Sequence, residues 1–160
     1  MRFVKESIIA ASAETVFAFH ERPDALARLT PPWQRVDIVR PPTSLAVGTR
    51  VTLRMKVGPF WQTVEAEHVA YEPGRMFADR IVKGPFARWL HRHVVTPRAR
   101  DESGGESCTL TDDIDYALPL GVVGRFVGGA FARRELERLF DYRHEVTRAA
   151  CESPRLTRPS

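Results

Sequence analysis

The feature that most constrains the fold is a long run of strand-like segments followed by a single helical pattern. Turns and loops containing Pro or Gly separate most of the segments 33–40, 49–57, 61–71, 76–82, 86–96 and 106–118. Successive short strands with such punctuation predict a large antiparallel sheet. The helical pattern over 122–150 would span roughly 40 Å at 1.5 Å per residue. One helix of that length is long enough to cross the sheet.

The chain before this run predicts one more strand and two short helices. Residues 2–11 read as a strand whose inward face is ambiguous, because both alternating sets contain apolar residues. Ser12 is a typical helix N-cap before "AETVFAFH". A second short helix starts at Pro23, and the sequence "TPP" at 30–32 ends it. The expected fold class is therefore α+β.

The alternation within the strands predicts which side chains face the interior. A strand with one buried face alternates apolar and polar residues, and a one-residue slip in register would invert the assignment. Segment 86–95 places two arginines on one face, so the opposite face, which carries Trp89, His91 and His93, is assigned inward. The same reasoning gives an inward set in three other strands: Val51, Leu53, Met55 and Val57; Gln62, Val64, Ala66, His68 and Ala70; Cys108, Leu110, Asp112, Ile114, Tyr116 and Leu118. Tyr71 falls on the outward face.

The helical segment shows two apolar stripes, and bulk properties limit the class of protein. Val123, Val127, Ala130 and Phe131 form one stripe, and Leu136, Leu139 and Phe140 form the other. A length of 160 residues predicts one domain. The net charge is +4, but the arginines are scattered among acids, so no nucleic-acid surface is expected. No apolar run is long enough for a membrane helix. Two distant cysteines and the absence of a recognisable export signal favour a cytoplasmic location.

Several stretches resemble one bacterial branch of the SRPBCC superfamily, the START-like and birch-pollen-allergen-like proteins. They are "SAETVFAFHERPDALARLTPP", "VGPFWQTVEAEHVAYEPGRMFADR", "GPFARWLHRH", "DDIDYALPLG" and "LERLFDYRH". The resemblance covers residues 1–148 and implies a helix-grip fold, in which a curved seven-stranded antiparallel sheet wraps a long C-terminal helix. We expect a ligand-binding domain over 1–150 and a disordered tail over 151–160. The superfamily includes lipid carriers and polyketide cyclases, so fold alone does not settle function.

In this fold a cavity lies between the sheet and the long helix, and we predict that it binds a small hydrophobic molecule. The candidate ligands are a lipid, an isoprenoid or a polyketide-like aromatic. An apolar wall with a few polar groups is typical of such sites. The predicted ligand-binding residues are His68, Trp89, His91, His93, Asp112, Tyr116, Leu53, Met55, Val64, Leu110 and Ile114. Val51 is also expected in the wall, and Asp79 or Arg80 could join the polar group. No cofactor is expected, and the oligomeric state is left open.

Three alternatives stay open at this point. A metal site would need His68 at the same height as His91 and His93, which the spacing does not indicate, so no metal is expected. A cyclase or dehydratase would use His91 or His93 with Asp112 as acid and base. A protein-interaction module would have a filled cavity and an exposed apolar patch. A cavity above about 300 Å³ would favour ligand binding, and a reachable His–Asp hydrogen bond would favour the enzyme.

Overall fold

A computed structural model describes residues 1–57, 59–99, 104–119 and 121–152. Strand β1 (Arg2–Ile9) precedes two helices, α1 (Ala13–Glu21) and α2 (Ala25–Arg28). The remaining strands follow in order, and the long helix α3 comes last: β2 (Val36–Arg40), β3 (Arg50–Val57), β4 (Phe60–Glu72), β5 (Met76–Lys83), β6 (Arg88–Pro97), β7 (Cys108–Ala117), α3 (Gly121–Cys151). All seven strands form one antiparallel sheet in the order β1-β7-β6-β5-β4-β3-β2. The expected α+β helix-grip fold is confirmed.

Local signals in the sequence fix the ends of these elements. The Ser12 hydroxyl accepts a hydrogen bond from the Thr15 backbone N–H at 3.1 Å, as expected of an N-cap. Gly74, in the turn between β4 and β5, has a φ of +72°, which a glycine adopts without the steric penalty of a side chain. The sheet therefore forms between turns that the sequence marks clearly.

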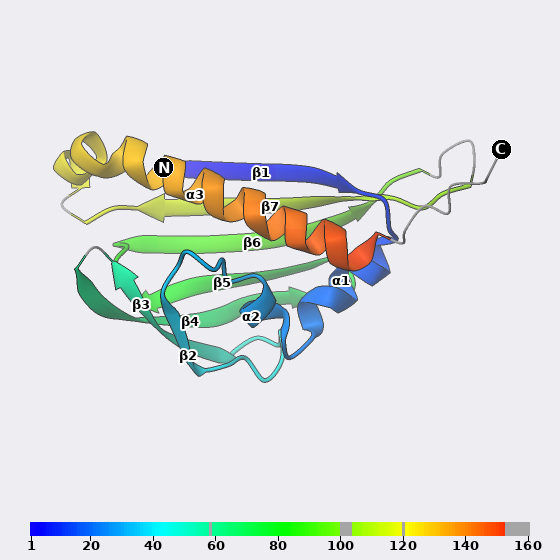
Figure 1. Ribbon diagram of the computed structural model, residues 1–160, viewed down its shortest axis with the longest axis horizontal. Coiled ribbons are helices and arrows are strands. Elements are labelled where there is room, and N and C mark those ends of the chain that lie inside the picture. Colours follow the sequence, from blue (N-terminus) through cyan, green and yellow to red (C-terminus); the bar gives the residue numbers. More distant parts are fainter. Residues whose placement is uncertain (58, 100–103, 120, 153–160) are drawn as a thin grey trace.

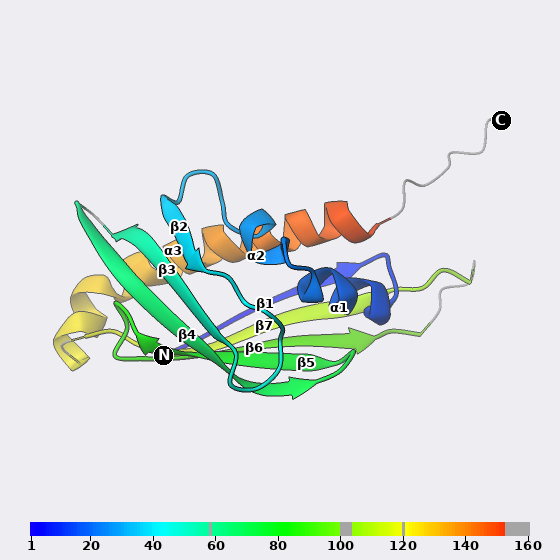
Figure 2. The same cartoon turned by 90° about the horizontal axis from the view of Figure 1, so that it is seen from below.

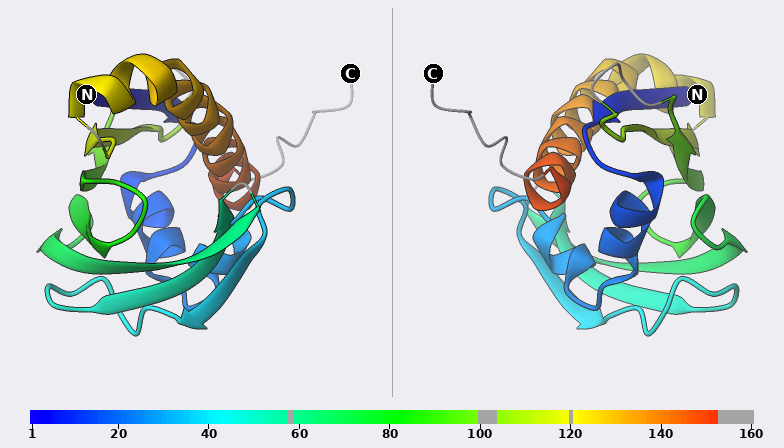
Figure 3. Two further views of the ribbon diagram at one scale, coloured as in Figure 1. Left: turned by 90° about the vertical axis from the view of Figure 1, so that its left-hand side faces the viewer. Right: turned by 90° about the vertical axis from the view of Figure 1, so that its right-hand side faces the viewer.

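The sheet curves around the helices, and α3 closes its concave side (Figure 3). Helix α3 runs along the half of the sheet that contains β1 and β7 (Figure 1), and α1 and α2 lie on the same concave side (Figure 2), where α1 contacts β6 and β7. One core cluster joins α1 to β1, β6 and β7 through Ile9, Val16, Phe17, Val95 and Leu110. A second core cluster joins α3 to β1 and β7, and it consists of Phe3, Ile114, Tyr116, Leu136 and Phe140. The β1–β7 half of the sheet is therefore filled with packed side chains.

The buried side of α3 corresponds to only one of the two predicted stripes. Leu136 and Phe140 are buried, and Leu139 packs partly buried beside them. The first stripe is wrong in its described part, because Ala130 is exposed and the Phe131 side chain is 70 % exposed. This end of the helix extends past the strands that would cover it (Figure 1). No helix in the described part of the chain has the length and apolar character required to cross a membrane.

A break in the alternation of β4 corrects the placement of Tyr71. The pairing of β4 with β5 shifts between His68 and Ala70, as at a β-bulge, which reverses the parity of the residues that follow. Tyr71 consequently packs against the α1 core, with its ring 6.1 Å from that of Phe17. At the other end of the chain α3 extends to Cys151, one residue into the predicted tail. Residues 153–160 of that tail lie outside the described residues.

Candidate functional site: a cavity with a buried histidine and aspartate cluster

A cavity of about 200 Å³ lies over the other half of the sheet, between β3–β6 and the segment containing α2. Its apolar wall comes from Leu26, Leu29, Leu45, Val51, Leu53, Val64, Ala66, Ile81 and Trp89. Its polar lining includes His20, His68, Asp79, His91, His93 and Arg143. The volume is below the range of about 300–1,000 Å³ that is usual for ligand pockets. The cavity therefore fits a small molecule better than a long lipid chain.

The inward assignment of His91, His93 and Asp112 agrees with the structure, and the register brings them together. His93 on β6 pairs directly with Asp112 on β7, and His91 pairs with Asp79 on β5. Side chains that are directly opposite on one face of a sheet are close neighbours. Two histidines of one strand are thus flanked by one aspartate from each neighbouring strand. His91, His93 and Asp112 are all buried.

Asp112 is the centre of the cluster, with a side chain that is only 4 % exposed. Its Oδ1 accepts a hydrogen bond from His91 Nε2 at 2.8 Å, and its Oδ2 accepts one from His144 Nε2 at 2.7 Å. His93 Nδ1 lies 2.7 Å from Oδ1 without the alignment of a hydrogen bond. Burial alone would raise the pKa of Asp112, but the surrounding histidines outweigh it and hold that pKa well below its usual range.

Asp79 faces the same two rings from the opposite side. Its Oδ2 lies 3.4 Å from His91 Nδ1 and 3.7 Å from His93 Nε2. Burial opposes ionisation of Asp79, yet the two histidines lower its pKa. Desolvation lowers the pKa of His91, but Asp112 and Asp79 together outweigh it and raise that pKa overall. The two carboxylates therefore favour a positive charge between them.

The remaining predicted residues divide between the cavity and the core. His68, Trp89, Leu53 and Val64 line the cavity, and Trp89 is half-buried at its wall. Leu110, Ile114 and Tyr116 lie in the packed core, because α1 and α3 cover β7 directly. Met55 is half-buried and is not part of the described lining. Of the two residues considered for the polar group, Asp79 joins it, and Arg80 points outward to pair with Glu67 at 3.1 Å.

The helices contribute three polar residues that alternation within the strands does not reveal. His144 and Arg143 come from α3, and His20 comes from α1, where its Nδ1 lies 2.8 Å from the backbone oxygen of Val16. A signal for His144 exists in the sequence, because it continues the line of Leu136 and Phe140 at intervals of four residues. The sequence contains a similar signal for His20 in α1, because His20 follows the apolar Val16 at the same spacing of four residues.

This element order and sheet topology define a helix-grip fold. The cavity lies beneath the segment containing α2 rather than along the C-terminal helix, where it was expected, and α3 contributes Arg143 to its lining. The chain belongs to the family described as polyketide cyclase / dehydrase and lipid transport, whose model matches residues 1–152. A comparison with curated protein sequences gave no significant match.

Solved structures share the fold at low sequence identity. Norcoclaurine synthase from Thalictrum flavum, in complex with dopamine and hydroxybenzaldehyde, is 15% identical, with a TM-score of 0.65 over 96% of this chain and 89% of that chain. The di-domain ARO/CYC StfQ of the steffimycin biosynthetic pathway is 12% identical, with a TM-score of 0.69 over 94% of this chain and 50% of that chain. A protein of Thermus thermophilus is 18% identical, with a TM-score of 0.65 over 95% of this chain and all of the other.

Proposed function

We propose that the protein binds a small, mostly apolar molecule that carries one polar oxygen group. The observation that supports this is a cavity whose apolar wall meets a polar end formed by the buried His68, His91 and His93 and the half-buried Asp79. The apolar wall supplies affinity, and a few fixed polar groups orient the ligand. His68 Nδ1 is buried without a hydrogen-bond partner among the described residues, so it is available to a ligand.

The cavity volume narrows the choice among the expected ligands. An apolar cavity of about 150 Å³ in another protein holds one benzene molecule, and the cavity here is about 200 Å³. A substituted aromatic ring fits this space, whereas a long acyl or isoprenoid chain does not fit it without movement of the walls. We therefore propose an aromatic ligand of one or two rings, with its oxygen at the histidine end.

The His–Asp hydrogen bond that the cyclase alternative requires is present between His91 and Asp112, but both ring nitrogens of His91 are occupied. His91 Nε2 bonds to Asp112, and Nδ1 faces Asp79 at 3.4 Å, so both nitrogens of His91 already face a carboxylate. A general acid or base must reach the substrate proton. The geometry of His91 thus favours a binding role over proton transfer. The cavity is smaller than the volume of about 300 Å³ that would by itself favour ligand binding. It is nevertheless not filled by side chains, which gives the interaction module less support than the binding of a small ligand.

The experiment is calorimetric titration with 1-naphthoate, which has two rings and a carboxylate, and with decanoate as the acyl-chain comparison. Ala66→Leu adds three carbons to a residue that lines the cavity, and Thr63→Leu adds a similar side chain on the outward parity of the same strand. We expect naphthoate to bind the wild type and Thr63→Leu, and to bind Ala66→Leu at least tenfold more weakly. Equal affinity for the two variants, or tighter binding of decanoate than naphthoate, would contradict the proposal.

A further inference from the structure

Three potential metal-binding atoms converge at the polar end of the cavity. Asp79, His91 and His93 each offer one ligand atom, and these atoms all lie within 4.8 Å of one another. The Asp79 Oδ2 is 3.4 Å from His91 Nδ1 and 3.7 Å from His93 Nε2. In a tetrahedral zinc site with bonds of about 2.0–2.1 Å, neighbouring ligand atoms are about 3.3 Å apart. The two separations from Asp79 exceed that value by only a few tenths of an ångström, and the two histidine nitrogens lie within 4.8 Å of each other.

We propose that Asp79, His91 and His93 form a binding site for one divalent transition-metal ion, with Zn²⁺ as the simplest occupant. Two imidazoles and a carboxylate are a ligand set that zinc and other first-row metals accept. The expectation of no metal rested on His68 as the third ligand. The register supplies Asp79 in its place, directly opposite His91 on β5.

The neighbours of the two histidines hold them in the orientation that a metal requires. Metal-binding histidines usually donate their second ring N–H to a carboxylate, which fixes the tautomer and the ring. His91 Nε2 donates such a hydrogen bond to Asp112 at 2.8 Å. His93 Nδ1 lies 2.7 Å from the same carboxylate oxygen without hydrogen-bond alignment, so Asp112 orients His91 directly and His93 by proximity. His144 in turn bonds to Asp112, and Phe77 stacks on the His93 ring with centroids 4.1 Å apart. A metal ion that displaces the proton between His91 and Asp79 would meet the lone pairs of His91 Nδ1 and His93 Nε2 beside the Asp79 carboxylate.

The fourth coordination position would be open to the cavity. All three proposed ligands line the cavity, and three protein ligands with one open position are the arrangement of reactive rather than structural zinc sites. A divalent ion with one carboxylate ligand retains a net positive charge, and the half-buried Arg143 lies in the same lining. An anionic oxygen, from water or from the ligand, suits this position. The ligand part of this step rests on the proposed function, whereas metal binding itself does not.

Calorimetric titration of chelator-treated protein with ZnCl₂ tests the site. We expect one ion per chain in the wild type and at least tenfold weaker binding in Asp79→Asn. The matched control is Asp113→Asn, which removes a carboxylate from the outer face of the same sheet and should bind zinc as the wild type does. The absence of stoichiometric binding to the wild type, or equal affinity in the two variants, would overturn the inference.

A second measurement does not depend on the folding of a variant. Wild-type crystals soaked in ZnCl₂ should give an anomalous difference peak between Asp79, His91 and His93, and a peak only elsewhere on the chain would overturn the site. Naphthoate titrated with and without zinc then tests the open position, where zinc should increase the affinity severalfold. An unchanged naphthoate affinity would overturn the role of the ion in ligand binding, while the zinc titration reports separately on the site.

Discussion

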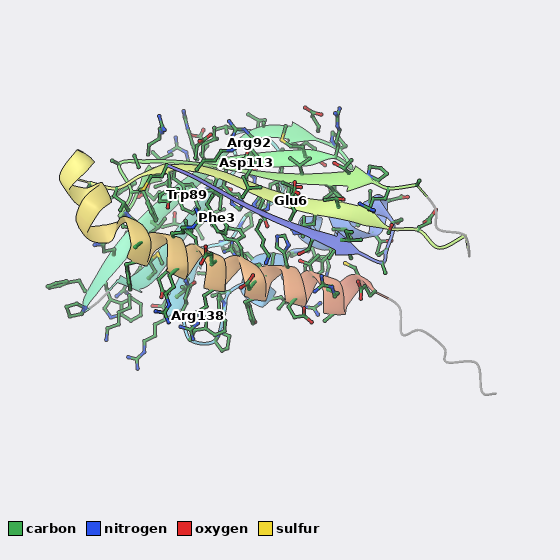
Figure 4. All side chains as sticks on the ribbon, turned by 90° about the horizontal axis from the view of Figure 1, so that it is seen from above. Phe3, Glu6, Trp89, Arg92, Asp113 and Arg138 are labelled. Atoms are coloured by element: carbon green, nitrogen blue, oxygen red, sulfur yellow. The ribbon has the colours of Figure 1, made fainter. Side chains whose placement is uncertain are left out.

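Asp112 and Asp113 are consecutive residues of β7 with opposite environments. Asp112 faces the interior, where its two oxygens contact His91, His93 and His144. Asp113 faces outward, where it accepts hydrogen bonds from Arg2 at 2.8 and 3.1 Å, and it lies on the outer face with Arg92 (Figure 4). The same side-chain chemistry therefore supports a buried polar cluster on one face and a solvated ion pair on the other.

The comparison shows how burial changes what a charge contributes. In both residues the pKa is lowered, by histidines at Asp112 against the effect of burial, and chiefly by the Arg2 hydrogen bond at Asp113. Exposed ion pairs typically contribute about 0–1 kcal/mol. Removing one partner of a buried pair costs about 3–5 kcal/mol, because the remaining charge is left without compensation. Strand parity alone decides which of these applies.

The largest expected effect follows from Asp112→Asn. This substitution keeps the shape of the side chain but removes the negative charge that raises the pKa of His91. We expect the free energy of unfolding to fall by about 3–5 kcal/mol, measured by urea denaturation at pH 7. A loss below about 1 kcal/mol would show that the histidines do not depend on this carboxylate, and the two faces would then be energetically alike.

The next effect is acid sensitivity through His20, to which burial, assisted by His93, gives a pKa of about 4 against the ordinary value of 6.5. As the pH falls from about 6.5 to 4, the unfolded chain binds a proton at His20 that the native chain does not. Stability therefore falls with decreasing pH in this window, by up to about 3 kcal/mol at 1.36 kcal/mol per pKa unit. Asp112 favours the charged form of His20, whereas His144 and His93 disfavour it.

The measurement compares the unfolding free energy of the wild type and His20→Gln between pH 7 and pH 4. His91, with its raised pKa, acts in the opposite direction, since its stabilising charge is present below its pKa and lost above it. The difference between the two proteins isolates His20, because His91 is common to both. We expect the wild type to lose more stability than His20→Gln on acidification, and parallel pH profiles would contradict a neutral buried His20.

Strand parity is predictable from the sequence because outward arginines mark one face of β6. Trp89, His91 and His93 are assigned inward on that basis, and Asp112 follows from the apolar residues around it in β7. These assignments need only the period of two that β6 and β7 keep throughout their pairing, whereas the bulge in β4 breaks it. The seven-stranded sheet and the long helix are likewise predictable, since each strand ends at a clear turn signal.

The register between strands and the position of the helices are not predictable in this way. Asp79 joins the cluster only because it pairs with His91, and a shift by one residue would replace it with Arg80 or Ala78. His144 reaches Asp112 only because α3 crosses β7 at that height. Leu110, Ile114 and Tyr116 belong to the core because helices cover that half of the sheet, a fact of tertiary packing that no single strand encodes.

A third prediction separates the cavity wall from the core on the inner face. Trp89 is half-buried and packs against Phe86, with ring centroids 4.8 Å apart. Truncation of a fully buried Trp costs about 3–5 kcal/mol. We expect Trp89→Ala to lower the free energy of unfolding by about 1.5 kcal/mol, half of the smaller of these values. Naphthoate should bind this variant at least tenfold more weakly. A full core-sized loss of stability would instead place Trp89 in the packed core, and unchanged stability and binding would refute its inward role.

The smallest effect is expected on the outer face, where Asp113→Asn should lower the unfolding free energy by less than about 1 kcal/mol. Its partner Arg2 has a side chain that is 65% exposed, so water replaces much of the lost interaction. Surface ion pairs are also screened by salt. The difference in unfolding free energy between the wild type and Asp113→Asn should therefore shrink as NaCl rises from about 0.02 M to about 1 M, because the Debye length at about 1 M is only about 3 Å. The corresponding difference for Asp112→Asn should persist. If high salt reduced both differences equally, the inner carboxylate would be accessible to solvent, and the contrast between the two faces would fail.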